Sequence, residues 1–134
     1  HVINLKLKRD DQLTQEANHI SEDQEGNIVL SMREGVYSYS YITGELSAEY
    51  LLPDKMIDNG NYIRAHLLSQ GILFIGTRDG LYALKRGNTT ALLISNTQAK
   101  IQTTDSHNIK VLYADNDDTL WIGTVEGLFS MSLS

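Results

Sequence analysis

The chain has 134 residues, a formal net charge of −6 and 41% hydrophobic residues. These values indicate one folded domain with a packed core, and the negative charge argues against a nucleic-acid groove, which needs clustered lysine and arginine. The absence of cysteine excludes disulfides and thiolate metal sites, although it does not fix the compartment.

The first segment, residues 2–8 (VINLKLK), alternates apolar and polar side chains. This period of two predicts a strand with one buried face. Neither this segment nor any later run approaches the ~18 apolar residues of a membrane helix. The pattern of a signal peptide is also missing, as it would be from a mature exported fragment. Residues 12–19 are the best helical candidate, and we interpret them as a connection.

One phrase then occurs three times. Its clearest copy is LWIGTVEG at 120–127; LFIGTRDG stands at 73–80, and a more divergent IVLSMREG stands at 28–35. The closing glycines of the three copies, which are 45 and 47 residues apart, are Gly35, Gly80 and Gly127. A period of this length is typical of propeller and solenoid repeats, and three such units cover nearly the whole chain.

The first repeat predicts four short strands separated by turns. The expected strands are 17–22, 27–32, 36–41 and 46–51. Gly26, Gly35 and Gly44 lie in the turns, where we expect the positive φ that a residue with a Cβ resists.

The second and third repeats have the same form. Their expected strands are 62–68, 72–77, 81–85, 90–95, 109–114, 119–124 and 128–133. Residues 53–61 and 96–108 link successive repeats. Short, regularly spaced strands with turn signals between them predict an all-β fold rather than strands that alternate with helices.

The repeats resemble the two-component regulator propeller repeat, in which each blade carries a phrase of the form D-x-x-G-x-L-W-I-G-T-x-x-G-L. Residues 115–129 (DNDDTLWIGTVEGLF) depart from this phrase only at Asp118, which replaces the first glycine. Residues 68–82 (LSQGILFIGTRDGLY) have leucine for the leading acid and Phe74 for the tryptophan. Residues 23–37 (DQEGNIVLSMREGVY) keep the acid and both glycines but lose the tryptophan and the Gly-Thr pair.

The resemblance implies β-propeller blades, four-stranded antiparallel sheets that stack because no sheet can bury both apolar faces alone. Residues 1–9 would be the outer strand of a preceding blade, residues 17–52 and 62–95 would be blades, and residues 109–134 a blade without its outer strand. A propeller usually needs about four to eight blades. We therefore expect the remaining blades to come from a longer protein or from another copy of the chain. Alternatively, residues 2–8 supply the missing strand of the third repeat, either in the same chain or in a second copy of the chain.

The positions that recur in the repeated phrase should have structural roles in such blades. Phe74 and Trp121, with their neighbours, should fill the space between blades. Gly76 and Gly123 should allow a neighbouring backbone to approach closely. The three closing glycines complete the structural motif.

No motif in the sequence carries an enzymatic or metal-dependent function. There is no nucleophile elbow, no phosphate-binding glycine loop and no zinc-protease motif. Residues 115–118 (DNDD) include three aspartates and Glu126 fits the twelfth position of an EF-hand loop, but the sixth position, which must be glycine, is Leu120. We therefore expect a non-catalytic chain with no cofactor and no bound metal.

The candidate ligand-binding residues come from turns and links that open at one end of a propeller. Their side-chain types differ between repeats at equivalent positions of the same backbone, as is expected of a surface that recognises a ligand. They are Arg33, Glu34, Tyr62, Arg78, Asp79, His107 and Glu126. Tyr37, Tyr39 and Tyr41 alternate within one expected strand, so they should face one way, either as packing or as a platform for a sugar ring.

The resemblance also implies a function, the periplasmic sensing region of a hybrid histidine kinase in the inner membrane. The parent would be a homodimer whose kinase lies outside this chain, and the ligand an oligosaccharide or polysaccharide fragment. Binding would favour one arrangement of the paired sensors and so shift a population of signalling states. Two alternatives stay open: a protein-interaction or dimerisation scaffold without a small ligand, and a fragment of a propeller enzyme.

Overall fold

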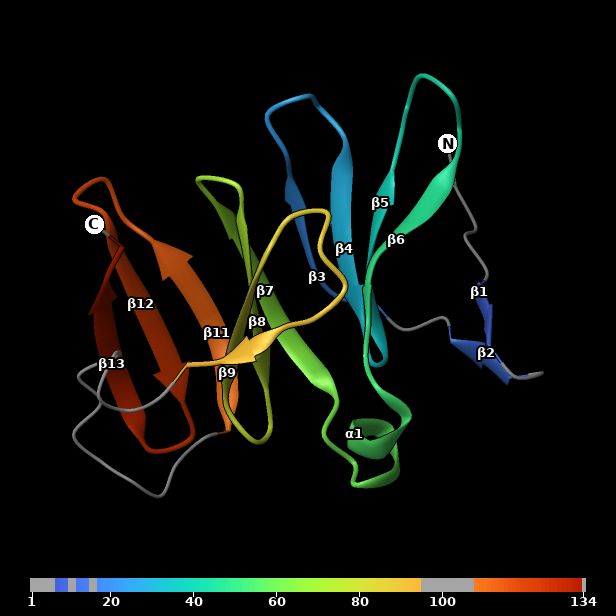
Figure 1. Cartoon of the computed structure of the whole chain (residues 1–134). Helices are drawn as coiled ribbons and strands as arrows, with labels where there is room; N and C mark the ends of the chain where they lie inside the picture. The colour runs from blue at the N-terminus through green and yellow to red at the C-terminus, as the bar shows by residue number, and fades with distance from the viewer. Residues whose placement is uncertain (1–6, 10–11, 15–16, 95–107, 134) are drawn as a thin grey trace.

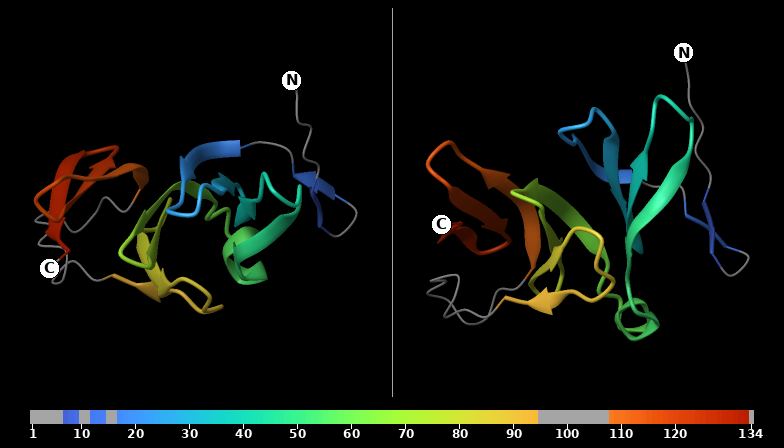
Figure 2. Two further views of the ribbon diagram at one scale, coloured as in Figure 1. Left: turned by 90° about the horizontal axis from the view of Figure 1, so that it is seen from above. Right: turned by 45° about the horizontal axis from the view of Figure 1, so that its top comes forward.

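The computed structural model describes residues 7–9, 12–14, 17–94 and 108–133. Three antiparallel sheets stand side by side and splay apart like the ribs of a fan (Figures 1 and 2). In each of them the strands that follow one another in the chain are also neighbours in the sheet. The predicted all-β fold, built of propeller-type blades, is confirmed.

The first sheet has four strands, and its turns are held by side-chain hydrogen bonds. The strands are β3 (Ala17–Glu22), β4 (Ile28–Met32), β5 (Gly35–Tyr39) and β6 (Leu46–Leu51). Between β3 and β4, Oδ1 of Asp23 accepts the backbone N–H groups of Glu25 at 2.9 Å and Asn27 at 2.8 Å. Gly26 completes this turn with a φ of 84°, so the leading acid and the glycine of the repeated phrase together make the hairpin.

The second sheet also has four strands. They are β7 (Ile63–Ser69), β8 (Ile72–Thr77), β9 (Leu81–Lys85) and β10 (Leu92–Leu93). Gln70 and Gly71 both have positive φ, 53° and 78°, and they join the paired residues Ser69 and Ile72. This is the two-residue hairpin whose twist matches the flanking strands. The helix α1 (Asp54–Asp58) precedes the sheet and packs Met56 and Ile57 on its core.

The third sheet has three strands within the described part of the chain. They are β11 (Ile109–Ala114), β12 (Thr119–Thr124) and β13 (Gly127–Ser132). Asp115 caps the turn between β11 and β12 as Asp23 does in the first sheet, by accepting the N–H groups of Asp117 and Thr119. Asp118 adopts a φ of 56° where the repeat usually has glycine. An aspartate tolerates this left-handed conformation better than most residues, which explains the departure from the repeat.

The apolar core lies between the sheets because the second strand of each one sends alternate side chains to opposite sides. Leu73 and Ile75 of β8 pack with Val29 of β4 between the first and second sheets. Phe74 faces the other way and packs with Leu120 and Ile122 of β12 between the second and third. Both faces of the middle sheet are therefore covered.

Trp121 occupies the place in β12 that Phe74 occupies in β8, but its surroundings differ. Phe74 is 6% exposed, whereas Trp121 is 36% exposed. The prediction that both fill a space between blades is correct for Phe74 and wrong for Trp121, because no described sheet follows the third. The indole N–H of Trp121 donates to Oδ2 of Asp115 at 2.8 Å, and this hydrogen bond contributes most to lowering the pKa of that carboxyl group.

Two predictions about glycine also need correction. Gly35 does not have a positive φ; a Cβ there would lie 2.9 Å from the carbonyl oxygen of Tyr50, so close packing explains the glycine. Gly76 and Gly123 do face close neighbours, but these are side chains, not backbone: Ile109 of the next sheet covers Gly76, and Val111 of its own sheet covers Gly123.

The three tyrosines do not share one strand. β5 ends at Tyr39, and Tyr41 lies in the following turn with 65% of its surface exposed. The rings of Tyr39 and Tyr41 meet edge to face, 5.9 Å apart. Tyr37 is buried against Leu30 and Met32 on the outer face of the first sheet, so packing accounts for it.

Near the start of the chain, the interpretation of residues 12–19 as a connection is wrong. β2 (Gln12–Thr14) pairs with β1 (Leu7–Arg9) as a separate two-stranded sheet, and Ala17 already begins β3. Within the described residues, β1 pairs with β2 and not with β13. The rest of the 2–8 segment lies outside the described residues.

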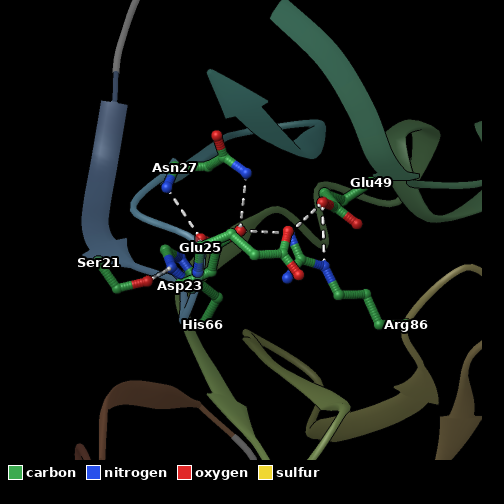
Figure 3. A network of polar contacts seen from close by, with 7 residues as sticks. All are labelled: Ser21, Asp23, Glu25, Asn27, Glu49, His66 and Arg86. Atoms are coloured by element: carbon green, nitrogen blue, oxygen red, sulfur yellow. Dashed lines mark hydrogen bonds and ion pairs between the residues drawn. The ribbon is translucent and has the colours of Figure 1, made fainter. Parts of the chain in front are cut away.

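Polar side chains join the first and second sheets beside their apolar core (Figure 3). His66 of β7 is fully buried, with Nε2 2.8 Å from Oγ of Ser21 and Nδ1 3.0 Å from Oγ of Ser31. The Ser31 hydroxyl donates to the carbonyl of His19 at 3.5 Å, so it accepts from a proton on Nδ1. The Ser21 hydroxyl can donate to an unprotonated Nε2, so the network also accommodates a neutral His66. Burial, together with the nearby His19, lowers the pKa of His66 to about 4.

Arg86 makes a second polar joint between these sheets (Figure 3). Its guanidinium donates to Oε1 of Glu49 at 2.7 and 3.1 Å and to Oδ2 of Asp23 at 3.0 Å. Hydrogen bonding to Glu49 is the main reason that the pKa of Arg86 is raised. Burial raises the pKa of Asp23, but the hydrogen bonds from Arg86 and Asn27 outweigh this and leave it lowered. The carboxylate of Asp23 therefore remains ionised near neutral pH.

We expect Gly76→Ala to lower the free energy of unfolding by about 1–3 kcal/mol, because the added methyl group would collide with Ile109 in a filled core. Urea unfolding measures this. Ile109→Ala removes part of the obstacle, so the same change made in that background should cost less. Equal costs in the two backgrounds would show that Ile109 is not the obstruction.

His66 predicts acid-sensitive packing. Its pKa is about 6.5 in the unfolded chain and about 4 in the folded one, so the unfolded state binds the proton at higher pH. Stability should be complete above pH 6.5 and fall as the pH drops towards 4, by up to about 3 kcal/mol. Urea unfolding between pH 4.5 and 7.5 should show this slope, and His66→Gln should flatten it. His19→Gln should keep most of it; a slope that His66→Gln leaves unchanged would contradict the assignment.

Candidate functional site

The first strands of the three sheets share an irregularity at the same position. β7 contacts β3 on one side and β11 on the other, so these strands lie in a row. Each shifts its pairing register by one residue near its start, between Ala17 and His19, Ile63 and Ala65, and Ile109 and Val111. The skipped residues are Asn18, Arg64 and Lys110. A bulge of this kind leaves one residue outside the ladder and redirects its side chain.

The bulged residues meet in an open pocket of about 460 Å³. It lies at the end where these strands begin, which is also the end of the turn between β4 and β5. The residues that line it are Asn18, Arg33, Tyr62, Ile63, Arg64 and Lys110. All three sheets and the link before β7 therefore contribute to one site.

Two contacts organise the pocket. The guanidinium carbon of Arg33 lies 4.1 Å from the centre of the Tyr62 ring, a cation–π contact that holds the turn of the first sheet over the link to the second. The amide Nδ2 of Asn18 donates to the carbonyl of Ile63 at 2.8 Å. The first bulge thus ties the first two sheets together at the pocket wall.

The charge of the pocket is positive although that of the chain is negative. Arg33, Arg64 and Lys110 all line it, and no carboxylate does. Among the described residues, none of these three cations forms an ion pair with an acid. Such a site can bind polar or negatively charged groups by charge-assisted hydrogen bonds.

The structure brings together two of the seven predicted ligand-binding residues, Arg33 and Tyr62. Glu34 is half-buried in the same turn as Arg33, and its carbonyl accepts the N–H of Leu52. His107 lies outside the described residues. The three others, which are exposed in the later turns and do not line the pocket, are Arg78, Asp79 and Glu126.

Asp79 has a structural contact instead. Its N–H donates to Oδ1 of Asn61, a buried side chain, at 2.9 Å. The turn after β8 is thereby bound to the link before β7.

Sequence reasoning missed Asn18, Arg64 and Lys110. They recur every 46 residues, one position after the start of each first strand. Aligning the repeats on their first strands, and not only on the glycine-rich phrase, would have placed them together. The bulge that directs them inward leaves no residue signature of its own.

Within the described residues, no group of three or more histidine, aspartate or glutamate side chains could hold a metal ion. In the same part of the chain, no helix has the length and hydropathy needed to cross a membrane.

Residues 104–126 match the family model described as two component regulator propeller. By sequence, no relative was found among curated proteins.

Solved structures share the fold over nearly the whole chain. The extracellular domain of the putative hybrid two component system BT4673 from B. thetaiotaomicron has a TM-score of 0.71 at 21% identity over 93% of this chain. The corresponding domain of BT3049 from the same organism has a TM-score of 0.59 at 17% identity over 93%. The computationally designed Ika4 protein has a TM-score of 0.57 at 17% identity and covers 92% of this chain and 74% of its own.

This chain spans only 16% and 17% of the length of the two B. thetaiotaomicron domains. Residues 104–126 therefore resemble a two-component regulator propeller repeat, and over nearly the whole chain the fold is similar to that of these solved structures.

Proposed function

We propose that this chain is part of the extracytoplasmic sensor propeller of a hybrid two-component signalling protein. The match of residues 104–126 to the regulator propeller carries the proposal. The likeness to extracellular domains of hybrid two-component proteins supports it. The location would then be the periplasm, and the parent a homodimeric histidine kinase of the inner membrane whose kinase part lies outside this chain. The chain itself would recognise a ligand and catalyse nothing.

The ligand of this sensor would be an oligosaccharide bound at the pocket of Asn18, Tyr62, Arg64 and Lys110. Its volume of about 460 Å³ lies within the range of roughly 300–1,000 Å³ that is common for small-molecule sites. Its polar and charged side chains can hydrogen-bond sugar hydroxyls, and Tyr62 adds an aromatic ring.

Such a ligand would touch three blades at once, because the pocket takes residues from all three sheets. A ligand that contacts several blades would bind some arrangements of the blades more tightly than others. Only such a difference can shift a conformational population. The proposed signal is therefore a change in the arrangement of the blades or of paired sensors.

A panel of neutral and acidic oligosaccharides tested by isothermal titration calorimetry checks this function. One class of sugar should bind, and Tyr62→Ala should weaken that binding roughly tenfold by removing a central aromatic contact. Tyr113→Ala, which removes an exposed tyrosine outside the pocket, should leave it unchanged. A folded chain that binds no sugar would contradict the proposed ligand class.

A second candidate function, a dimerisation or interaction scaffold, is favoured by the free face of the third sheet. Val111, Tyr113, Trp121 and Leu128 lie on this face, opposite the buried Leu120 and Ile122. Their exposed fractions run from 36% for Trp121 to 66% for Leu128. In a longer parent the next blade would cover this face; in this chain alone a second copy could.

For the scaffold, sedimentation should give a mass near twice the 15.0 kDa of the chain. Leu128→Glu should restore the single-chain mass, because it places a charge in the apolar contact. Leu93→Glu, on an exposed side chain of the short β10, is the matched control and should leave the dimer intact. A single-chain mass for the unaltered protein would exclude self-association through this face.

A further inference from the structure

We infer that the pocket of Asn18, Arg33, Tyr62, Arg64 and Lys110 selects an acidic oligosaccharide, through the carboxylate or sulfate groups of its sugars. This inference rests on the proposed sensor function and names the ligand class of the same site. It follows from where the fold places positive charge and where it leaves that charge without a partner.

The first step is the convergence of like charges. Arg33 comes from the turn of the first sheet, Arg64 from the second sheet and Lys110 from the third, yet all three line one pocket of about 460 Å³. Like charges brought together repel one another. The pocket lining contains no carboxylate to offset this repulsion, so a bound anion would relieve it.

The second step is a comparison with the other end of the first two sheets. There Arg86 lies against two carboxylates, Glu49 at 2.7 Å and Asp23 at 3.0 Å. That cation joins blades and is neutralised within the fold. Arg64 and Lys110 have no such acid among the described residues, although the chain carries 17 acidic residues against 11 basic ones. The pocket therefore differs from the structural ion pairs of the same molecule.

The third step is the device that places the cations. Arg64 and Lys110 are the bulged residues of their strands. Neither residue takes part in the regular strand pairing, and other residues form the apolar core of the two sheets. Neither position needs a cation for the fold, since the equivalent bulge in the first sheet holds the neutral Asn18. Their charge is therefore available for binding.

The geometry suits a carboxylate or a sulfate. A guanidinium presents N–H groups in a planar fork that matches two oxygens of one anion, and an ammonium adds a point charge. Arg33 is steadied by its contact with Tyr62, so part of the site is ordered before a ligand arrives. The size of the pocket leaves room for the sugar ring that carries the anion.

Four probes separate the sources of binding in calorimetry on the whole chain: trigalacturonate, a sulfated chondroitin disaccharide, neutral galactotriose and sodium sulfate. At least one acidic sugar should bind about tenfold or more tightly than galactotriose and than sulfate ion. Raising the salt from 50 to 500 mM should weaken it about tenfold or more, because salt screens exposed charges.

Substitutions in the pocket should have matching effects. Arg64→Glu and Lys110→Glu should each weaken acidic sugar binding at least about tenfold, and Arg64→Gln should act in the same direction by less. Lys85→Glu changes the charge equally on an exposed side chain of β9 outside the pocket and should have no effect. Circular dichroism checks that each variant is folded, and Arg64→Gln carries the test if Arg64→Glu does not fold.

The opposing outcomes are distinct. Galactotriose binding as tightly as the acidic sugars, and unaffected by Arg64→Gln, would overturn the inference and leave the sensor function standing. Sulfate ion binding as tightly as the acidic sugars would show a simple anion site and also overturn it. If no sugar binds the folded chain, both this inference and the proposed ligand class fail.

Discussion

The structure depends on the fact that a blade is apolar on both faces. β8 shows this most directly, since Leu73 and Ile75 point to the first sheet while Phe74 points to the third. Burying each such side chain contributes roughly 1.5–3 kcal/mol to stability. A sheet with only one neighbour could bury only one of its two faces. Stacking is therefore a condition of folding rather than a later assembly step. The same constraint leaves Trp121 partly exposed, because no described sheet packs against its face of the third sheet.

Polar contacts give the apolar stack its alignment. Two apolar surfaces can shift relative to each other at little cost in free energy, whereas a buried hydrogen bond is formed in one arrangement only. His66 reaches from the second sheet to two serines of the first, and Arg86 reaches from the second sheet to Asp23 and Glu49. These contacts lie between the two complete blades. They set the angle and register at which the blades meet, and hence the distance between the bulges that line the pocket.

The repeats made most of the fold predictable. Asp23 and Gly26, or Asp115 with Asp118, mark hairpins whose chemistry is local, and period two marks the strands between them. The environment of a side chain was harder to foresee. Trp121 and Phe74 hold corresponding positions, but only the number of neighbouring blades decides which is buried. Gly35 was misjudged because a close approach of distant backbone, not local φ, requires it. Only one of the three cations of the pocket was predicted: Arg33 lies in a recognisable turn, whereas the inward direction of Arg64 and Lys110 depends on a register shift that leaves no residue signature.

The bulge at the start of each first strand separates two demands on the sequence. In the second sheet the residues on either side of it, Ile63 and Ala65, are fully buried and must keep their size. The extra residue between them takes part in neither the ladder nor the core. Asparagine, arginine and lysine already occupy this position in three successive blades without any change to the frame. A propeller assembled from such units could thus acquire a new specificity by exchanging one side chain per blade, while its architecture, and the stability that goes with it, stays as it was.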